Sequence, residues 1–189
     1  MENHHDSGKY VIVFLLKGNI KKDHKNLADR LAKKYKLRSV SETVDAHITL
    51  KGFRTLLNQY KVKDIEELLK QFCKNHSEVK LQLKGISNFG RRVIFMDVIP
   101  SYEMKKIYND FTREMDKIGW MEWNEFDKER IHFHATLVEG KEDLEEFDDI
   151  LDFAKKEKPE FNLKMDNISI LTKPKDRWVL YKRFKLLKA

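Results

Sequence analysis

Hydrophobic residues along the chain follow two patterns, one typical of strands and the other of amphipathic helices. Short apolar or alternating stretches favour β-strands, whereas apolar residues three or four positions apart favour helices. The first pattern predicts strands at residues 10–16, 46–53, 79–86, 93–99, 131–138, 161–171 and 177–186. The second predicts helices at residues 22–36, about 63–75, 101–118 and about 144–154. The chain therefore mixes strands and helices throughout.

The order β-α-β-α-β occurs twice, and the last two strands are expected to form a hairpin. The halves also share local sequence. "VIVFLL" (11–16) opens the first and "VIFMDV" (93–98) the second, whereas "LKGIS" (83–87) and "MDNIS" (165–169) close them. Alternating elements recur by chance in many folds, so the matching strand sequences carry the argument. We therefore predict an internal duplication.

The chain is expected to form one domain. Its 189 residues include only three prolines and seven glycines, and no stretch resembles a flexible linker. We predict a disordered N-terminus at residues 1–9 and a single domain at residues 10–189. Its lobes would comprise residues 10–88 and 89–189, approximately, and the last hairpin is a candidate for exchange between them.

The composition indicates which class of partner the protein binds and in which cellular compartment it is located. The net charge of +7 favours polyanions such as nucleic acid or nucleotides, although lysines that alternate with acids also fit a merely solvated surface. The single cysteine, Cys73, excludes an internal disulfide and fits a reducing cytosol. The longest apolar run, residues 10–16, is shorter than the roughly 20 residues of a membrane helix. "MENHHDSGK" also lacks the layout of a secretory signal, so we expect a cytoplasmic protein without membrane contact.

One four-residue motif occurs in both halves. "HITL" spans residues 47–50 and "HATL" spans residues 134–137, 87 residues later (134 − 47). Side chains two positions apart on a strand share a face. His47 and Thr49 therefore share one face, as do His134 and Thr136. If the halves are duplicates, a pseudo-twofold axis would bring these two polar faces together across a cleft.

Such a cleft suits phosphodiester chemistry. Two imidazoles can act as general base and general acid on opposite sides of one phosphorus, because histidine exists in both protonation states near neutral pH. Threonine hydroxyls can donate hydrogen bonds to the non-bridging oxygens. This scheme requires no metal and no cofactor. One motif alone would indicate only a strand with a polar face, but two copies at equivalent places favour a catalytic site.

The paired motifs resemble the signature of the two-histidine (2H) phosphoesterase superfamily, which contains the 2′-5′ RNA ligase-like proteins and cyclic phosphodiesterases. The resemblance covers about residues 10 to 187. It implies an α+β fold with two lobes related by a pseudo-twofold axis, each an antiparallel sheet with outer helices, around a central cleft. It also implies a metal-independent enzyme for 2′,3′-cyclic phosphates, 2′-5′-linked oligonucleotides or related nucleotides. The catalytic positions implied are His47, Thr49, His134 and Thr136.

Two further segments resemble the RNA ligase-like branch. "ISNFGRRVIFMDV" (86–98) is similar to a segment whose phenylalanine lines the cleft, here Phe89. "LTKPKDRWVLYKRFKL" (171–186) is similar to the closing hairpin, in which a serine and a tyrosine approach the substrate. Thr172 and Trp178 stand at those places, and the tryptophan retains an aromatic face for stacking on a base. The resemblance thus implies substrate binding by these three residues.

Several neighbours of the motifs are further candidates. His132 is expected to share the face of His134, where it could support the site or bind substrate. Three histidines could also bind zinc, but no acidic or sulfur ligand is spaced to complete a site, so we expect no metal. Lys51 continues the face of His47 and could contact a phosphate, or be an exposed lysine at a strand end. Asp45 could orient His47 or be a solvated carboxylate at the rim.

Three other features have simpler interpretations. The aromatic segment "GWMEWNEF" (119–126) could wall the cleft or stack on bases, but anchoring of a long loop is the commoner outcome. His24 and His76 fall on predicted helices without a pattern of partners, so we expect both at the surface.

The sequence therefore predicts a monomeric phosphodiesterase that hydrolyses 2′,3′-cyclic phosphates of RNA ends or nucleotides. Alternatives are a 2′-5′ oligonucleotide phosphodiesterase or ligase-like activity, a non-catalytic module that binds RNA ends, and a zinc-dependent hydrolase. The expected partner is an RNA or nucleotide substrate.

Overall fold

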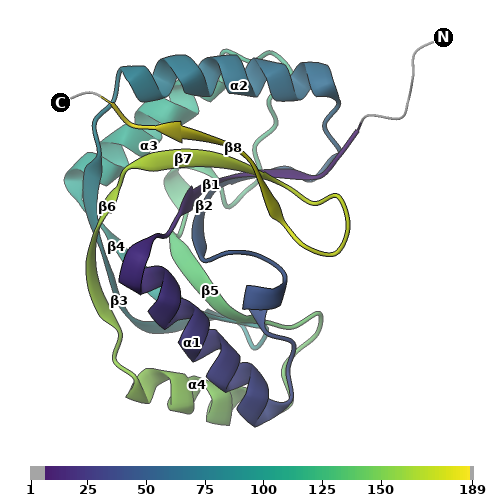
Figure 1. The fold of residues 1–189 in the computed structure, drawn as a ribbon, viewed down its shortest axis with the longest axis vertical. Coiled ribbons are helices and arrows are strands. Elements are labelled where there is room, and N and C mark those ends of the chain that lie inside the picture. Colours follow the sequence, from purple (N-terminus) through teal and green to yellow (C-terminus); the bar gives the residue numbers. More distant parts are fainter. Residues whose placement is uncertain (1–6, 188–189) are drawn as a thin grey trace.

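The computed structural model describes residues 7–187, which form eight strands and four α-helices (Figure 1). The strands are β1 (Tyr10–Leu15), β2 (His47–Gly52), β3 (Val79–Phe89), β4 (Val93–Pro100), β5 (His134–Glu139), β6 (Glu160–Met165), β7 (Asn167–Thr172) and β8 (Val179–Lys185). The helices are α1 (Gly18–Tyr35), α2 (Gln59–Lys74), α3 (Tyr102–Met115) and α4 (Phe147–Lys156), with 3₁₀ turns η1 (Val40–Glu42) and η2 (Lys128–Arg130).

Only part of the segment predicted to be disordered, residues 1–9, is among the residues that the structure describes. Residues 1–6 lie outside the described residues. Gly8 is described, and it exchanges two backbone hydrogen bonds of 2.9 Å with Leu57. Ordered structure therefore begins before Tyr10.

Helix boundaries follow capping residues that the apolar pattern does not reveal. Helix α2 begins at Gln59, ahead of the predicted residue 63, because the Asn58 side chain accepts a hydrogen bond from the Lys61 amide. Ser101 caps α3 in the same way through the Met104 amide. Each cap satisfies a backbone donor that the first turn of a helix leaves unpaired.

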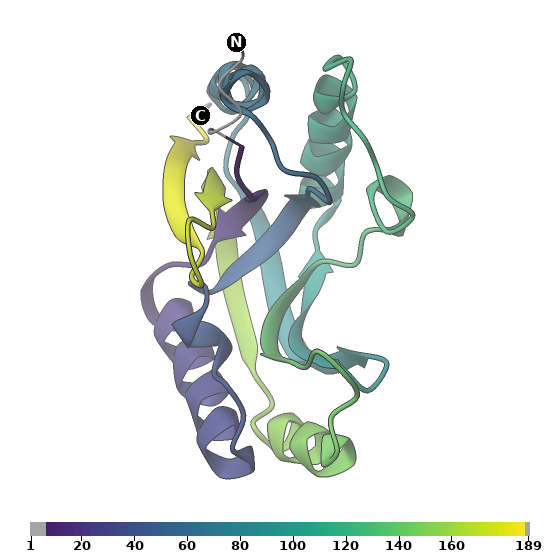
Figure 2. The same ribbon diagram turned by 90° about the vertical axis from the view of Figure 1, so that its right-hand side faces the viewer.

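The strands form two four-stranded antiparallel sheets, with orders β2-β1-β7-β8 and β5-β4-β3-β6. This confirms the predicted α+β class with two antiparallel sheets. Helices α2 and α3 lie at one end of the molecule, and α1 and α4 lie at the other (Figures 1 and 2). The sheets do not each contain the strands of one half, because β3 pairs with β4 and the hairpin β7–β8 pairs with β1.

Two predicted strands differ from those observed. The predicted strand 161–171 is divided at Asp166, since β6 pairs with β3 whereas β7 pairs with β1 in the other sheet. The predicted strand 131–138 begins only at His134, because the β4–β5 ladder ends at the pair of Asp97 and His134. The apolar pattern continues through both boundaries, and only the pairing partners reveal them.

The pairing of β3 with β6 supports the predicted duplication. The matching segments "LKGIS" and "MDNIS" are offset by 82 residues (165 − 83). Leu81 faces Leu163 in the β3–β6 ladder, and these residues have the same offset (163 − 81). Equivalent residues that face each other in an antiparallel pair are related by a local twofold axis. The two halves therefore meet at this pair.

Both motif strands carry a bulge at the same place. Leu50 in β2 and Leu137 in β5 each follow the motif threonine, and the register of the ladder shifts at each. A bulge changes the direction in which the following side chains point. Lys51 and Val138, the next residues, are accordingly buried rather than continuing the face of the histidine and threonine.

Most buried apolar residues form one continuous core that includes strands of both sheets and all four helices. A smaller cluster of Val13, Leu15 and Leu171 lies apart from it, with the Trp178 ring packed against it. Among residues 7–187, no helix is long and apolar enough to cross a membrane.

Candidate active site

The two motifs line one cavity. The cavity has a volume of about 280 Å³, and β2 and β5 contact each other there. His47 and Thr49 reach it from β2, and His134 and Thr136 reach it from β5. The structure thus brings together the four residues that the sequence singles out, although 87 residues separate the motifs (134 − 47).

Each motif imidazole is held by a backbone carbonyl two residues earlier. Nδ1 of His47 lies 2.8 Å from the Asp45 carbonyl oxygen, and Nδ1 of His134 lies 2.7 Å from that of His132. A carbonyl only accepts hydrogen bonds, so Nδ1 carries the hydrogen in both rings. In the neutral ring Nε2 is then unprotonated and available for proton transfer. The two halves therefore prepare their imidazoles in the same way.

Burial lowers the pKa of both imidazoles. For His47 the neighbouring His134 lowers the pKa further, whereas the Asp45 carbonyl opposes the shift. For His134 the His132 carbonyl and the carboxylates of Asp97 and Glu139 oppose the effect of burial. Both rings are accordingly biased toward the neutral form, and nearby carboxylates oppose this bias at each: Asp45 at His47, and Asp97 and Glu139 at His134.

The comparisons with known proteins identify the family. A model of the 2′-5′ RNA ligase superfamily matches residues 21–177, most of the chain. The chain belongs to this superfamily. The predicted membership of the two-histidine phosphoesterases is thereby confirmed. Membership supports an enzyme with phosphodiesterase-type activity.

Several solved structures share the fold of this chain. LigT of Escherichia coli complexed with 3′-AMP is 13% identical with a TM-score of 0.62, and the alignment covers 97% of this chain and 100% of that one. A protein of Thermus thermophilus is 14% identical with a TM-score of 0.64, over 94% and 97% of the two chains. A structure described as a phosphoesterase gives a TM-score of 0.63 at 13% identity, over 97% and 100%. No curated protein matches the chain.

A third histidine of this chain, His24, lies in the cavity that the two motifs line. His24 of α1 is only 4% exposed, lines the cavity, and has an Nε2 atom with no hydrogen-bond partner. Burial, and secondarily the neighbouring His47, lowers the pKa of His24 to about 4. The expectation of a surface histidine is therefore wrong. The helical spacing of Ile20, His24, Leu27 and Leu31 is the signal that places it on the buried face.

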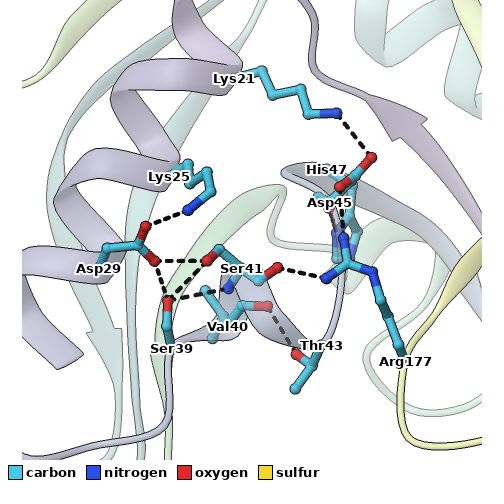
Figure 3. A network of polar contacts seen from close by, with 10 residues as sticks. All are labelled: Lys21, Lys25, Asp29, Ser39, Val40, Ser41, Thr43, Asp45, His47 and Arg177. Carbon is cyan, nitrogen blue, oxygen red and sulfur yellow. Dashed lines mark hydrogen bonds and ion pairs between the residues drawn. The ribbon is translucent and has the colours of Figure 1, made fainter. Parts of the chain in front are cut away.

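Asp45 connects the segment before His47 to two other parts of the chain (Figure 3). Its carboxylate pairs with Lys21 of α1 at 2.8 Å and with Arg177 of the β7–β8 hairpin at 3.0 Å. Arg177 also donates to the Ser41 carbonyl at 2.7 Å. Asp45 thus holds the His47 ring through its carbonyl and holds the surrounding segments through its carboxylate.

Asp29 anchors the other end of this segment to α1 (Figure 3). It accepts hydrogen bonds of 2.6 Å from both Ser39 and Ser41 and pairs with Lys25. Partial burial opposes ionisation, but the hydrogen bonds from Lys25, Ser39 and Ser41 lower the pKa of Asp29 to about 2. The segment that leads into His47 is therefore tied down on both sides.

Both aromatic residues that the resemblance assigns to substrate binding, Trp178 and Phe89, lie at the site. Trp178 lines the cavity, and its amide donates to the Thr43 carbonyl at 2.7 Å. Phe89 is 40% exposed, and its ring centroid lies 4.9 Å from that of His134, edge-on at 88°. Thr172 is not among the residues that line the cavity, and its hydroxyl donates to the Lys9 carbonyl.

Lys51 is not exposed, and it is directed away from the histidines. Its side chain is 2% exposed and pairs with Asp127 at 2.6 Å, with the Trp123 ring 4.7 Å away. The alternative of an exposed lysine is therefore wrong, and a phosphate contact has no support because Lys51 lines a different cavity. The bulge at Leu50 accounts for this direction.

The aromatic segment at residues 119–126 is anchored to the body of the protein. The indole nitrogen of Trp120 donates to Asp64 and that of Trp123 donates to Asp116. Neither residue lines the cavity of the two motifs. These contacts favour an anchoring role for the segment.

His132 belongs to a neighbouring cavity rather than to that of His47. Its Nε2 lies 2.8 Å from Asp97, and its ring centroid is 6.4 Å from that of His134. Within residues 7–187, no group of three or more histidine, cysteine or acidic residues is arranged to hold a metal ion. The part of the chain that the structure describes thus offers no built zinc site.

Proposed function

We propose that the protein is a metal-independent phosphodiesterase that hydrolyses 2′,3′-cyclic phosphates of RNA ends or nucleotides. One observation carries the proposal. Two imidazoles, each held at Nδ1 by a backbone carbonyl and each followed by a threonine, reach one cavity from two different strands. Such a pair of titratable groups can supply the general base and the general acid for phosphodiester cleavage without a metal.

In the proposed reaction, one imidazole accepts a proton from water at Nε2 while the water oxygen attacks phosphorus. The bond between phosphorus and one ribose oxygen breaks, and the other imidazole donates a proton to that oxygen. One water is consumed, and the product is a phosphomonoester beside a free hydroxyl. Exchange of protons with solvent then restores the starting forms.

Thr49 and Thr136 would donate hydrogen bonds to the non-bridging phosphate oxygens. Preset donors stabilise the charge that develops there without reorganisation during the reaction. Trp178 lines the cavity and the exposed Phe89 ring contacts His134, so either ring can stack on the base. We therefore assign catalysis to the two motifs and base binding to these two aromatic residues.

A substrate panel measured in EDTA tests the proposal. It contains nucleoside 2′,3′-cyclic monophosphates, RNA with a cyclic phosphate end and 2′-5′-linked oligoadenylate. We expect turnover of the cyclic phosphates, undiminished by the chelator. Activity lost to EDTA and restored by zinc would indicate a metal-dependent hydrolase instead.

The same panel decides between the alternatives. The superfamily's description favours 2′-5′-linked oligonucleotides as the second candidate substrate. Turnover of oligoadenylate alone would select that activity, and RNA affinity without any turnover would select a binding module. A cytoplasmic location and a monomeric state stay predictions.

A further inference from the structure

A second cavity adjoins the His134 side of the candidate active site. Its volume is about 490 Å³, within the range of small-ligand sites. It lies between the end of β4, the first turns of α3 and the segment that precedes β5. Its polar lining residues include Asp97, Lys105, Tyr108, Asn109, Glu129 and His132. The proposed reaction gives this cavity no role.

The cavity shares a wall with the catalytic histidine. Asp97 faces His134 in the β4–β5 ladder, so the two side chains lie on the same face of the sheet. Asp97 also holds the His132 ring at 2.8 Å, and His132 supplies the carbonyl that orients His134. A molecule bound in this cavity would therefore lie on the His132 side of a phosphate bound at His134, whose ring centroid is 6.4 Å from that of His132.

One buried group in the cavity lining lacks a partner. Tyr108 is 4% exposed, and its hydroxyl has no acceptor for its hydrogen in the described structure. A buried hydroxyl that makes no hydrogen bond destabilises the folded protein. Burial raises the pKa of Tyr108, so the hydroxyl keeps its proton and remains a hydrogen-bond donor. A ligand acceptor at this point would relieve the cost.

The remaining lining suits a nucleoside. Apolar surface for a planar base is supplied by Val98, Pro100, Ile131 and Phe133. The exposed side chains of Asn109 and Glu129 offer an amide and a carboxylate, which are groups that pair with base edges. Lys105 has no ion-pair partner among residues 7–187 and is available to a phosphate.

We propose that this cavity binds the nucleoside that precedes the cyclic-phosphate end, so that the protein acts on RNA ends in preference to free cyclic mononucleotides. This inference rests on the proposed function. A terminal nucleotide with a 2′,3′-cyclic phosphate continues only in the 5′ direction, so a single neighbour needs a site next to the catalytic cavity.

The test compares kcat/KM for a nucleoside 2′,3′-cyclic monophosphate with that for a dinucleotide ending in the same group. The wild type should prefer the dinucleotide. Tyr108→Phe and Asn109→Ala should each lower dinucleotide kcat/KM about 3- to 10-fold, as the loss of one hydrogen bond predicts, and leave the mononucleotide unchanged. Tyr35→Phe is the matched control, because its hydroxyl bonds the Asp149 carbonyl outside this cavity.

Each result has a separate meaning. Equal kcat/KM for both substrates in the wild type, with the mononucleotide turned over, overturns the inference and leaves the proposed function intact. The inference is also overturned if both variants retain the full dinucleotide preference. It is likewise overturned if the variants lose kcat/KM equally on the two substrates. If neither substrate is turned over, the proposed function and this inference are overturned together.

Discussion

Single residues of the cavity show what a sequence pattern can reveal and what it leaves out. His47 and His134 are recognisable because each stands in the same motif of a repeated unit. The carbonyl contacts at Nδ1 involve main-chain atoms and leave no trace in residue identity. His24 has a readable helical spacing, but a polar residue on a buried face is easily assigned to the surface. Its position in the cavity depends on how α1 packs against β5.

His24 should make stability depend on pH. Its pKa is about 4 in the folded protein, against an ordinary value of 6.5. Between these values the unfolded chain binds more protons, so the free energy of unfolding should fall as the pH decreases from 6.5 toward 4. The full effect is about 3 kcal/mol, and it is absent above pH 6.5. His24→Leu should remove it, as measured by urea unfolding at pH 5 and pH 7.5.

The control for this measurement is His76→Leu, because His76 lies outside the cavity and its Nδ1 bonds the Phe72 carbonyl. His47 and His134 leave a residual dependence of the same sign in every variant, since their pKa values are also lowered. An identical loss of stability at pH 5 in wild type and His24→Leu would contradict the account.

At the scale of secondary-structure elements, the sequence pattern predicts the strands but not where their regular pairing is interrupted. Strict alternation in "HITL" and "HATL" correctly predicts which side chains share a face up to the threonine. The bulges at Leu50 and Leu137 then break the alternation, and a bulge is defined by the partner strand rather than by its own sequence. Lys51 therefore points inward against the expectation from its own strand. The division at Asp166 is hidden for the same reason, because β6 and β7 differ only in their neighbours.

The buried pair of Lys51 and Asp127 gives a stability prediction. Lys51→Met leaves the Asp127 carboxylate, which is 8% exposed, without its cation, and it should cost about 3–5 kcal/mol. The double variant Lys51→Met/Asp127→Leu should recover most of this loss, because an apolar pair carries no desolvation penalty. Urea unfolding of the single and double variants measures both effects.

The exposed pair of Arg91 and Asp148 is the matched control for that cycle. Arg91→Met should cost less than about 1 kcal/mol, as exposed pairs generally do. A Lys51→Met variant that is no more destabilised than Arg91→Met would contradict the prediction.

At the scale of the whole molecule, the duplication explains why two distant motifs form one site. The local twofold at Leu81 and Leu163 relates the halves, and the histidines come from strands of different sheets. The repeat is visible in the sequence. Which sheet receives β3 and the β7–β8 hairpin is not, because strand pairing is a non-local choice that each strand's own pattern does not encode. The structural relatives, at 13–14% identity, show that this arrangement tolerates extensive sequence change.

The most direct test measures hydrolysis of a nucleoside 2′,3′-cyclic monophosphate, in EDTA, by wild type, His47→Ala, His134→Ala and the double variant. Groups that act as one unit give non-additive losses. Each single variant should lose roughly 10²- to 10⁴-fold in kcat, and the double variant should be little worse than either. Near-wild-type activity in either single variant, or losses that multiply in the double variant, would contradict two-histidine catalysis.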